Sequence, residues 1–213
     1  MIDIIVADDH PLLREGIKKI LKEQTSDIRI VKEAANAGDL LKHLNDGLPD
    51  LVILDITMPR KSGIDALKDL KDIYPNLPVL ILSMHPEDRF AIRAIKAGAM
   101  GYLNKSSIGE ELVEAIRMIV TQKRRFINAS VAEELARQIG GTDGNELPHL
   151  SLSDREFQVF RLIVSGKKIS NIAEDLSLSV QTIHTYKTRL KKKMNMASNA
   201  DLTRYAIKHN IVD

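Results

Sequence analysis

The chain has 213 residues, of which 44% are apolar and 28% are charged, and none is cysteine. This length allows one or two domains with buried cores, whereas the lack of cysteine excludes disulfide scaffolds, thiolate zinc sites and cysteine nucleophiles. No apolar run approaches the roughly 18 residues that span a bilayer, and acidic residues stand where a secretory signal is basic, so we expect a cytoplasmic protein without a membrane segment.

Charge is distributed unevenly along the chain. Residues 1–125 carry 19 basic and 19 acidic side chains, residues 126–147 carry 1 and 4, and residues 148–213 carry 11 and 6. The basic surplus in the last third favours contact with a polyanion such as nucleic acid. A basic surface that is merely solvated would explain this surplus of basic residues equally well.

Apolar runs typical of strands alternate with helical segments over residues 1–122. The five expected strands are Ile4–Ala7, Ile28–Val31, Leu51–Leu54, Val79–Leu82 and Gly101–Leu103. The expected helices are Pro11–Gln24, Gly38–Asn45, Ile64–Tyr74, Glu87–Ala97 and Gly109–Gln122. The third and fourth strands are continuously apolar, as strands covered on both faces are. The alternation predicts a doubly wound α/β domain with a five-stranded parallel sheet, whose functional site lies at the carboxyl ends of the strands.

Polar residues follow four of these strands. Asp8 and Asp9 end the first strand, Asp55 ends the third, Ser83 ends the fourth and Lys105 follows the fifth. Because the carboxyl ends of parallel strands share one edge, the carboxylates should converge, and Mg²⁺ would relieve their repulsion. A metal, an ammonium and a hydroxyl around one carboxylate indicate phosphoryl chemistry, with that carboxylate attacking phosphorus.

These residues, together with Leu54-Asp55-Ile-Thr-Met-Pro59 and the segment Gly98–Lys105, resemble the receiver domain of two-component response regulators. The resemblance covers roughly residues 1–122 and implies a flavodoxin-like fold. It implies that Asp55 accepts a phosphoryl group from a sensor histidine kinase. The receiver would catalyse only its own phosphorylation and dephosphorylation, so the chain is not expected to be an enzyme.

The same resemblance assigns roles to the other site residues. Asp9, Asp55 and the backbone carbonyl of Thr57 would bind Mg²⁺ directly, while Asp8 would act mainly through water. Ser83 and Lys105 would hold the phosphoryl oxygens, and Ser83 and Tyr102 would form the switch, with Tyr102 turning inward when Ser83 moves.

Each of these side chains has a commoner role when it is taken alone. A strand-end aspartate usually caps a helix, a serine such as Ser83 usually lies in a turn, and a lone lysine is usually solvated. Tyr102 has the alternative role of a half-buried strand aromatic. The agreement of five positions in one order favours the phosphoryl site. The histidines His10, His43, His85, His149 and His209 lack ligand spacing, and we expect them at the surface or in loops.

Residues 123–147 read as a linker with a short helix near residues 130–139, and the pattern from residue 148 onward is all helical. Ser153-Asp-Arg-Glu156 is a capping box, and the helix that it opens carries Phe157, Phe160 and Ile163 on one face. A helix over residues 169–176, a turn over 177–179 and a basic helix from about Val180 to Asn195 then follow. This order predicts a small all-α helix-turn-helix domain over residues 148–213, closed by a helix over Asn199–Lys208.

A helical wheel separates two faces of the basic helix. The side that should pack on the core holds Ile183, Tyr186, Leu190 and Met194. The outward side holds Gln181, His184, Thr185, Thr188 and Lys192, flanked by Arg189, Lys191 and Lys193. Short polar groups with basic residues at the rim suit a DNA major groove, where the centre reads bases and the rim holds phosphates. The alternative for the lysines is a solvated helix end that complements the helix dipole.

The last third resembles the LuxR-type DNA-binding domain through Leu152-Ser153-x-Arg155-Glu156, Ile172-Ala173-x-x-Leu176-x-Leu178-Ser179-x-x-Thr182-Ile183 and Leu190-x-x-Lys193-Met194. The whole chain therefore resembles response regulators of the NarL/FixJ type. The implied partners are a sensor histidine kinase, double-stranded DNA and a second copy when phosphorylated or DNA-bound, with RNA polymerase as a further candidate.

Two other functions are compatible with parts of the sequence. One is a constitutive DNA-binding regulator with a silent receiver, which the intact acidic cluster disfavours. The other is a Mg²⁺-dependent phosphatase. Asp55-x-Thr57 lacks the second acid that aspartate-nucleophile phosphatases place two residues later, so this alternative is weaker.

Overall fold

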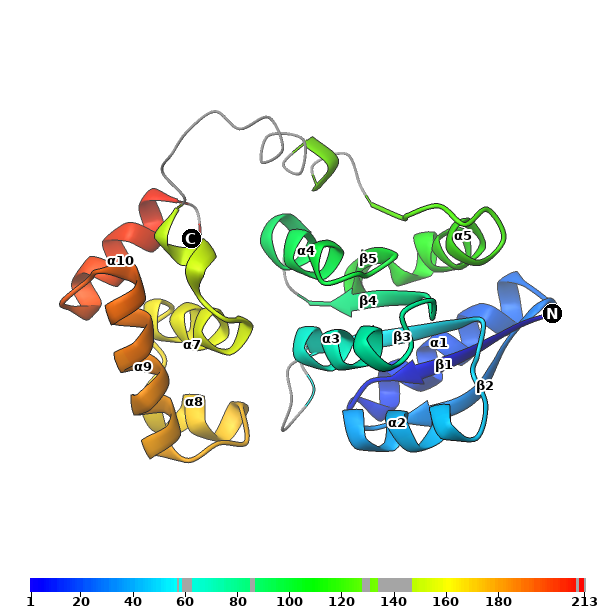
Figure 1. Cartoon of the computed structure of the whole chain (residues 1–213), viewed down its shortest axis with the longest axis horizontal. Coiled ribbons are helices and arrows are strands. Elements are labelled where there is room, and N and C mark those ends of the chain that lie inside the picture. Colours follow the sequence, from blue (N-terminus) through cyan, green and yellow to red (C-terminus); the bar gives the residue numbers. More distant parts are fainter. Residues whose placement is uncertain are drawn as a thin grey trace. The chain divides into compact units, whose positions relative to one another are not determined.

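The computed structural model describes residues 1–56, 58, 63–84, 87–127, 131–133, 147–209 and 211–212. The chain divides into two compact units, Met1–Thr142 and Asp143–Asp213 (Figure 1). Within the described ranges, every helix is too short or too polar to cross a membrane.

A five-stranded sheet forms the centre of the first unit. Its strands lie in the order β2-β1-β3-β4-β5, and every neighbouring pair is parallel. The strands are β1 (Ile2–Ala7), β2 (Ile28–Ala34), β3 (Leu51–Asp55), β4 (Val79–Ser83) and β5 (Gly101–Asn104). The helices are α1 (Pro11–Gln24), α2 (Ala37–Asn45), α3 (Gly63–Ile73), α4 (Glu87–Lys96) and α5 (Ile108–Val120), with a 3₁₀ turn, η1 (Lys105–Ser107). The predicted doubly wound, flavodoxin-like fold is confirmed.

Helices cover both faces of this sheet. α1 and α5 pack on one face through a buried cluster that includes Ile17, Leu21, Leu112 and Ile116. α2, α3 and α4 lie on the opposite face (Figure 1). The inner strands β3 and β4 are buried along their whole length, as their continuous apolar runs predict. The strand order reverses direction beside β1, and sites in this fold class lie at the carboxyl ends of the strands near that point.

The chain just after α5 adds a short extension to the open edge of β5. Phe126 forms a parallel bridge with Gly101. The Phe126 amide donates to the carbonyl of Met100 at 2.9 Å, and its carbonyl accepts from the Tyr102 amide at 3.2 Å. The sequence predicts a linker at this residue, because a single bridging residue leaves no alternating pattern. Residues 131–133 are helical, and the rest of the predicted helix 130–139 lies outside the described residues.

The second unit is all helical over its described residues, as predicted. It contains a 3₁₀ turn, η2 (Pro148–Ser151), and the helices α7 (Asp154–Val164), α8 (Ile169–Asp175), α9 (Val180–Met194) and α10 (Asn199–Lys208). Ser153 and Glu156 form the predicted capping box at the start of α7. Phe157, Phe160 and Ile163 are buried on one face of that helix, so the predicted amphipathic pattern is confirmed.

The close approach at Gly101 gives a stability prediction. A Cβ atom there would lie 2.9 Å from Leu80 Cδ1 and 3.0 Å from the carbonyl oxygen of Phe126. Gly101→Ala should therefore lower the free energy of unfolding of the first unit by about 1–3 kcal/mol and increase hydrogen exchange at Phe126. Gly109→Ala is the matched control because a Cβ at Gly109 meets nothing within 4 Å. Urea unfolding with equal stabilities for the two variants would contradict the predicted clash.

Candidate functional site

Acidic side chains meet at the carboxyl edge of the sheet. Asp8 and Asp9 directly follow β1, and Asp55 is the last residue of β3. Asp8 and Asp55 are both 0% exposed. Ligand-type atoms of Asp8, Asp9, His10 and Asp55 all lie within 4.8 Å of one another. The structure thus brings the three predicted carboxylates together and adds a histidine.

The Lys105 ammonium lies between two of these carboxylates. Its Nζ atom is 2.7 Å from Asp8 Oδ2 and 3.0 Å from Asp55 Oδ2, and the side chain is 4% exposed. Like charges in a dry site repel strongly unless a cation is close, so this ammonium offsets much of the repulsion. The position of Lys105 directly after β5 brings its side chain to the same edge.

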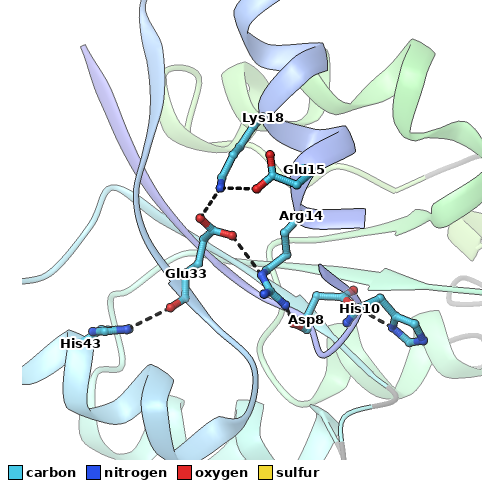
Figure 2. A network of polar contacts seen from close by, with 7 residues as sticks. All are labelled: Asp8, His10, Arg14, Glu15, Lys18, Glu33 and His43. Atoms are coloured by element: carbon cyan, nitrogen blue, oxygen red, sulfur yellow. Dashed lines mark hydrogen bonds and ion pairs between the residues drawn. The ribbon is translucent and has the colours of Figure 1, made fainter. Parts of the chain in front are cut away.

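The loop between β1 and α1 holds Asp8 in a defined orientation. The backbone N–H of His10 donates to Asp8 Oδ1 at 2.7 Å. The His10 ring Nδ1 lies 3.0 Å from Asp8 Oδ1 (Figure 2). The same atom lies 3.0 Å from Asp9 Oδ1. Pro11 opens α1 directly afterwards. His10 lies in this loop and is exposed, as predicted, and the lack of ligand spacing gave no sign of its contacts with the two carboxylates.

The donor set fits a hard divalent cation. The carboxylates of Asp8, Asp9 and Asp55 offer oxygen atoms, which are the ligands that Mg²⁺ prefers. The half-exposed Asp9 leaves one side of the cluster open to solvent, as an ion that keeps several waters requires. Thr57, whose carbonyl is a predicted ligand, and Pro59 lie outside the described residues.

Ser83 and Tyr102 are the two remaining residues that were predicted for this site. Ser83 ends β4, is 0% exposed, and pairs with Asn104 at the carboxyl end of β5. Tyr102 lies on β5 and is 3% exposed, so its ring is already inside in this structure. The coupled movement of these two residues remains a prediction.

The outward face of α9 is polar and exposed. The exposed residues are Gln181, His184, Thr185, Thr188, Arg189, Lys192 and Lys193, whereas Lys191 is half-buried. Ile183, Leu190 and Met194 are buried on the inner side, and Tyr186 is half-buried. The Thr185 hydroxyl donates to the Gln181 carbonyl at 3.1 Å, and the Thr188 hydroxyl donates to the His184 carbonyl at 3.0 Å. Both threonine oxygens therefore remain available as acceptors.

Two lysines that were predicted at the rim of this face have partners within the chain. Lys193 Nζ lies 2.6 Å from Glu156 Oε2, and Lys191 Nζ donates to the Ala197 carbonyl at 2.9 Å. Burial alone would raise the pKa of Glu156, but hydrogen bonds from Lys193 and Ser153 outweigh it and hold that pKa below its usual value of 4.5. Lys193 thus joins the C-terminal end of α9 to the capping box of α7.

His149 was predicted to lie at the surface or in a loop, and its placement at the surface is wrong. It is 1% exposed, and its Nδ1 atom lies 2.5 Å from the hydroxyl oxygen of Tyr205. Its ring also lies beside that of Phe157, at 6.2 Å between centroids. The 3₁₀ turn η2 folds the ring inward between α7 and α10. A single histidine in a Pro- and Ser-containing turn carries no periodic signal that predicts this burial.

Comparison with known proteins gives matches over both units. The response regulator receiver domain matches residues 4–117, and the luxR family of bacterial regulatory proteins matches residues 150–206. Response regulator GacA of Pseudomonas aeruginosa (strain PAO1) is 34% identical over 213 residues, which cover 100% of this chain and 99% of GacA. Response regulator UvrY of Escherichia coli (strain K12) is 33% identical over 211 residues, or 99% of this chain and 96% of UvrY.

The solved structures that resemble this chain are also response regulators. RcsB from Salmonella enterica serovar Typhimurium, bound to promoter P1flhDC in the presence of the phosphomimetic BeF₃⁻, has a TM-score of 0.62 and 27% identity, covering 96% of this chain and 97% of RcsB. A two-component response regulator of the LuxR family from Aurantimonas sp. SI85-9A1 has a TM-score of 0.59 and 36% identity, covering 66% of this chain and 99% of that one.

The ion pair between Lys193 and Glu156 gives a prediction about pH. Glu156→Gln should lower the unfolding free energy of the second unit by about 1–2 kcal/mol at neutral pH, a value reduced by the partial exposure of Lys193. Because the folded-state pKa of Glu156 is lowered, the ionised group stabilises the fold fully above pH 4.5, and this contribution is lost as pH falls through the lowered pKa. In Glu156→Gln, the unfolding free energy should therefore lack the decrease that protonation of Glu156 causes as pH falls below 4.5.

Urea unfolding, followed through NMR signals of residues 148–209 at several pH values, measures both effects. Glu174→Gln is the matched control, since Glu174 is exposed on α8. Equal stability losses and equal pH profiles for the two variants would contradict the stabilising role of the ion pair.

Proposed function

Because the chain belongs to the response regulators of the NarL/FixJ type, in which a receiver precedes a LuxR-type DNA-binding domain, we propose that phosphorylation of Asp55 by a sensor histidine kinase controls its binding to DNA. It regulates transcription within a two-component system. The observation that carries the proposal is the buried ammonium of Lys105, held between Asp8 and Asp55 at the edge of the sheet.

The geometry supports transfer of a phosphoryl group to Asp55. One oxygen of Asp55 would attack phosphorus, the phosphorus–nitrogen bond of the kinase phosphohistidine would break, and the imidazole nitrogen would keep the electron pair. Lys105 lies 3.0 Å from this carboxylate, close enough to pair with an oxygen of the new phosphoryl group. The hydroxyl of Ser83 would donate to another phosphoryl oxygen.

Asp9, Asp55 and the carbonyl of Thr57 would hold Mg²⁺, and Asp8 would contact it through water. When bound, Mg²⁺ supplies positive charge beside the phosphoryl oxygens. The close grouping of the carboxylates supports this assignment. We propose no turnover beyond phosphorylation and dephosphorylation of the chain itself.

The exposed face of α9 would enter the major groove of double-stranded DNA. Gln181, His184, Thr185 and Thr188 would face base edges, because they form the exposed centre of that face. Arg189 and Lys192 would contact phosphates at its rim. Lys191 and Lys193 would contribute less than the sequence analysis predicted, since both already have partners within the chain.

A phosphorylated or DNA-bound homodimer would place two such helices on neighbouring half-sites. RcsB was solved on promoter DNA with a phosphomimetic, which supports the coupling of phosphorylation to DNA binding here. If its DNA partner is a promoter, as for RcsB, this chain would act in the cytoplasm, with RNA polymerase as a candidate partner.

Intact mass tests the phosphoacceptor. After incubation with acetyl phosphate and Mg²⁺, the wild-type chain should gain the mass of one phosphoryl group. The adduct should disappear when EDTA replaces Mg²⁺ and in Asp55→Asn, which keeps the shape of the side chain but lacks the nucleophilic carboxylate. An adduct that persists in Asp55→Asn would rule out Asp55 as the acceptor, and no wild-type adduct with acetyl phosphate or with a phosphorylated kinase would favour a silent receiver.

The salt dependence of DNA binding separates the two neighbouring lysines. Lys192→Gln should weaken binding similarly on all duplexes and lower the slope of log K against log salt by about one, because a phosphate contact is lost. Lys193→Gln should leave the slope unchanged, because its ammonium pairs with Glu156 and not with a phosphate. It should still weaken binding, because loss of this ion pair removes a contact between α9 and α7. Fluorescence anisotropy at several salt concentrations measures both slopes. A reduced slope in Lys193→Gln would instead assign Lys193 to the DNA backbone.

A further inference from the structure

Arg14, on α1, joins the end of β1 to β2. Its Nη1 atom donates to the backbone carbonyl of Asp8 at 2.6 Å, and its Nε atom lies 3.0 Å from Glu33 Oε2 (Figure 2). The Arg14 side chain is only 16% exposed. One guanidinium therefore holds a backbone carbonyl and a carboxylate at once, which its fixed fork of donors allows.

The pairing of β1 with β2 brings Glu33 to this position. The register of the two strands shifts by one residue midway along the pair, so that Val6 pairs with Glu33. Paired residues of neighbouring parallel strands face the same side of the sheet, and Val6 belongs to the core beneath α1 and α5. Without the shift, Lys32 would pair with Val6 and would bring a positive charge toward Arg14 and Lys18.

Further contacts hold Glu33 in place. Lys18 Nζ lies 2.5 Å from Glu33 Oε1, and the His43 ring Nε2 lies 3.0 Å from the Glu33 backbone oxygen (Figure 2). Burial raises the pKa of Glu33, but the hydrogen bonds from Lys18 and Arg14 outweigh it and lower that pKa. Glu33 thus stays ionised at neutral pH and anchors the guanidinium of Arg14.

The carbonyl that Arg14 holds belongs to the peptide bond between Asp8 and Asp9. Rotation of that peptide would turn both carboxylates relative to Asp55. We propose that Arg14 is a positioning residue that fixes this peptide and thereby sets the two carboxylates for Mg²⁺. The inference rests on the proposed function, since it assumes that the same acidic cluster binds Mg²⁺.

Substitutions at Arg14 should produce a graded loss of Mg²⁺ affinity. Arg14→Gln removes the charge and the fork, and partners that orient metal ligands typically change metal affinity by about 10–100-fold when they are replaced. Arg14→Lys keeps the charge but cannot hold both Asp8 and Glu33 with the same geometry, so its loss should be smaller. Glu33→Gln should give an intermediate loss because it frees the guanidinium.

The experiment is a Mg²⁺ titration of the unphosphorylated full chain, followed by amide NMR shifts. Arg29→Gln is the matched control, because Arg29 also ties β2 to β1, through Asp3 at 2.6 Å, at the end of the strands away from the site. We expect Arg14→Gln to weaken Mg²⁺ binding by about tenfold or more and Arg29→Gln to change it by less than about twofold. Urea unfolding of each variant measures structural damage separately.

The outcomes are distinct. Wild-type affinity in folded Arg14→Gln would overturn the positioning role and leave the proposed phosphoacceptor site intact. Absence of Mg²⁺ binding by the wild-type chain would overturn both. If Arg14→Gln does not fold, Arg14→Lys decides: unchanged Mg²⁺ affinity in that variant would overturn the inference, and a loss larger than that of Arg29→Gln at matched stability would support it.

Discussion

The repulsion between Asp8 and Asp55 is the constraint on which the receiver site depends. Both carboxylates are fully buried at the ends of adjacent strands, and the fold alone brings them together. Lys105 lies within 3.0 Å of both and offsets part of their charge. The buried carboxylates can bind a doubly charged cation, and the ammonium of Lys105 can pair with an anionic phosphoryl group. Each added charge would thus lie beside a group of opposite charge.

The second unit meets a different constraint, which is the orientation of one exposed helix. The capping box of α7 fixes Glu156, and Glu156 in turn holds Lys193 near the end of α9. The inner side of α9 is anchored by Ile183 and Leu190, so its polar face stays outward. Of two neighbouring lysines in α9, Lys193 therefore stabilises the unit itself, whereas Lys192 is exposed on the outward face.

Much of this arrangement follows from patterns that the sequence displays. Continuous apolar runs predict buried strands, and capping residues predict helix starts, because both depend on neighbours in the chain. Contacts between distant segments lack such signals: Arg14 meets Glu33 through the register of β2 on β1, and Phe126 meets Gly101 through the backbone. His149 was misplaced for the same reason, since its burial depends on Tyr205 and not on its neighbours.

Phosphorylation as the control of DNA binding is tested by comparing the DNA affinity of the chain with and without the phosphoryl group on Asp55. The full-length chain, with its phosphorylation verified by intact mass, would be titrated at one salt concentration into a duplex selected from a random pool. We expect at least about fivefold tighter binding by the phosphorylated form, in the usual range for coupled sites, and no such gain in Asp55→Asn. Equal affinities of the two forms would contradict phosphorylation as the control of DNA binding.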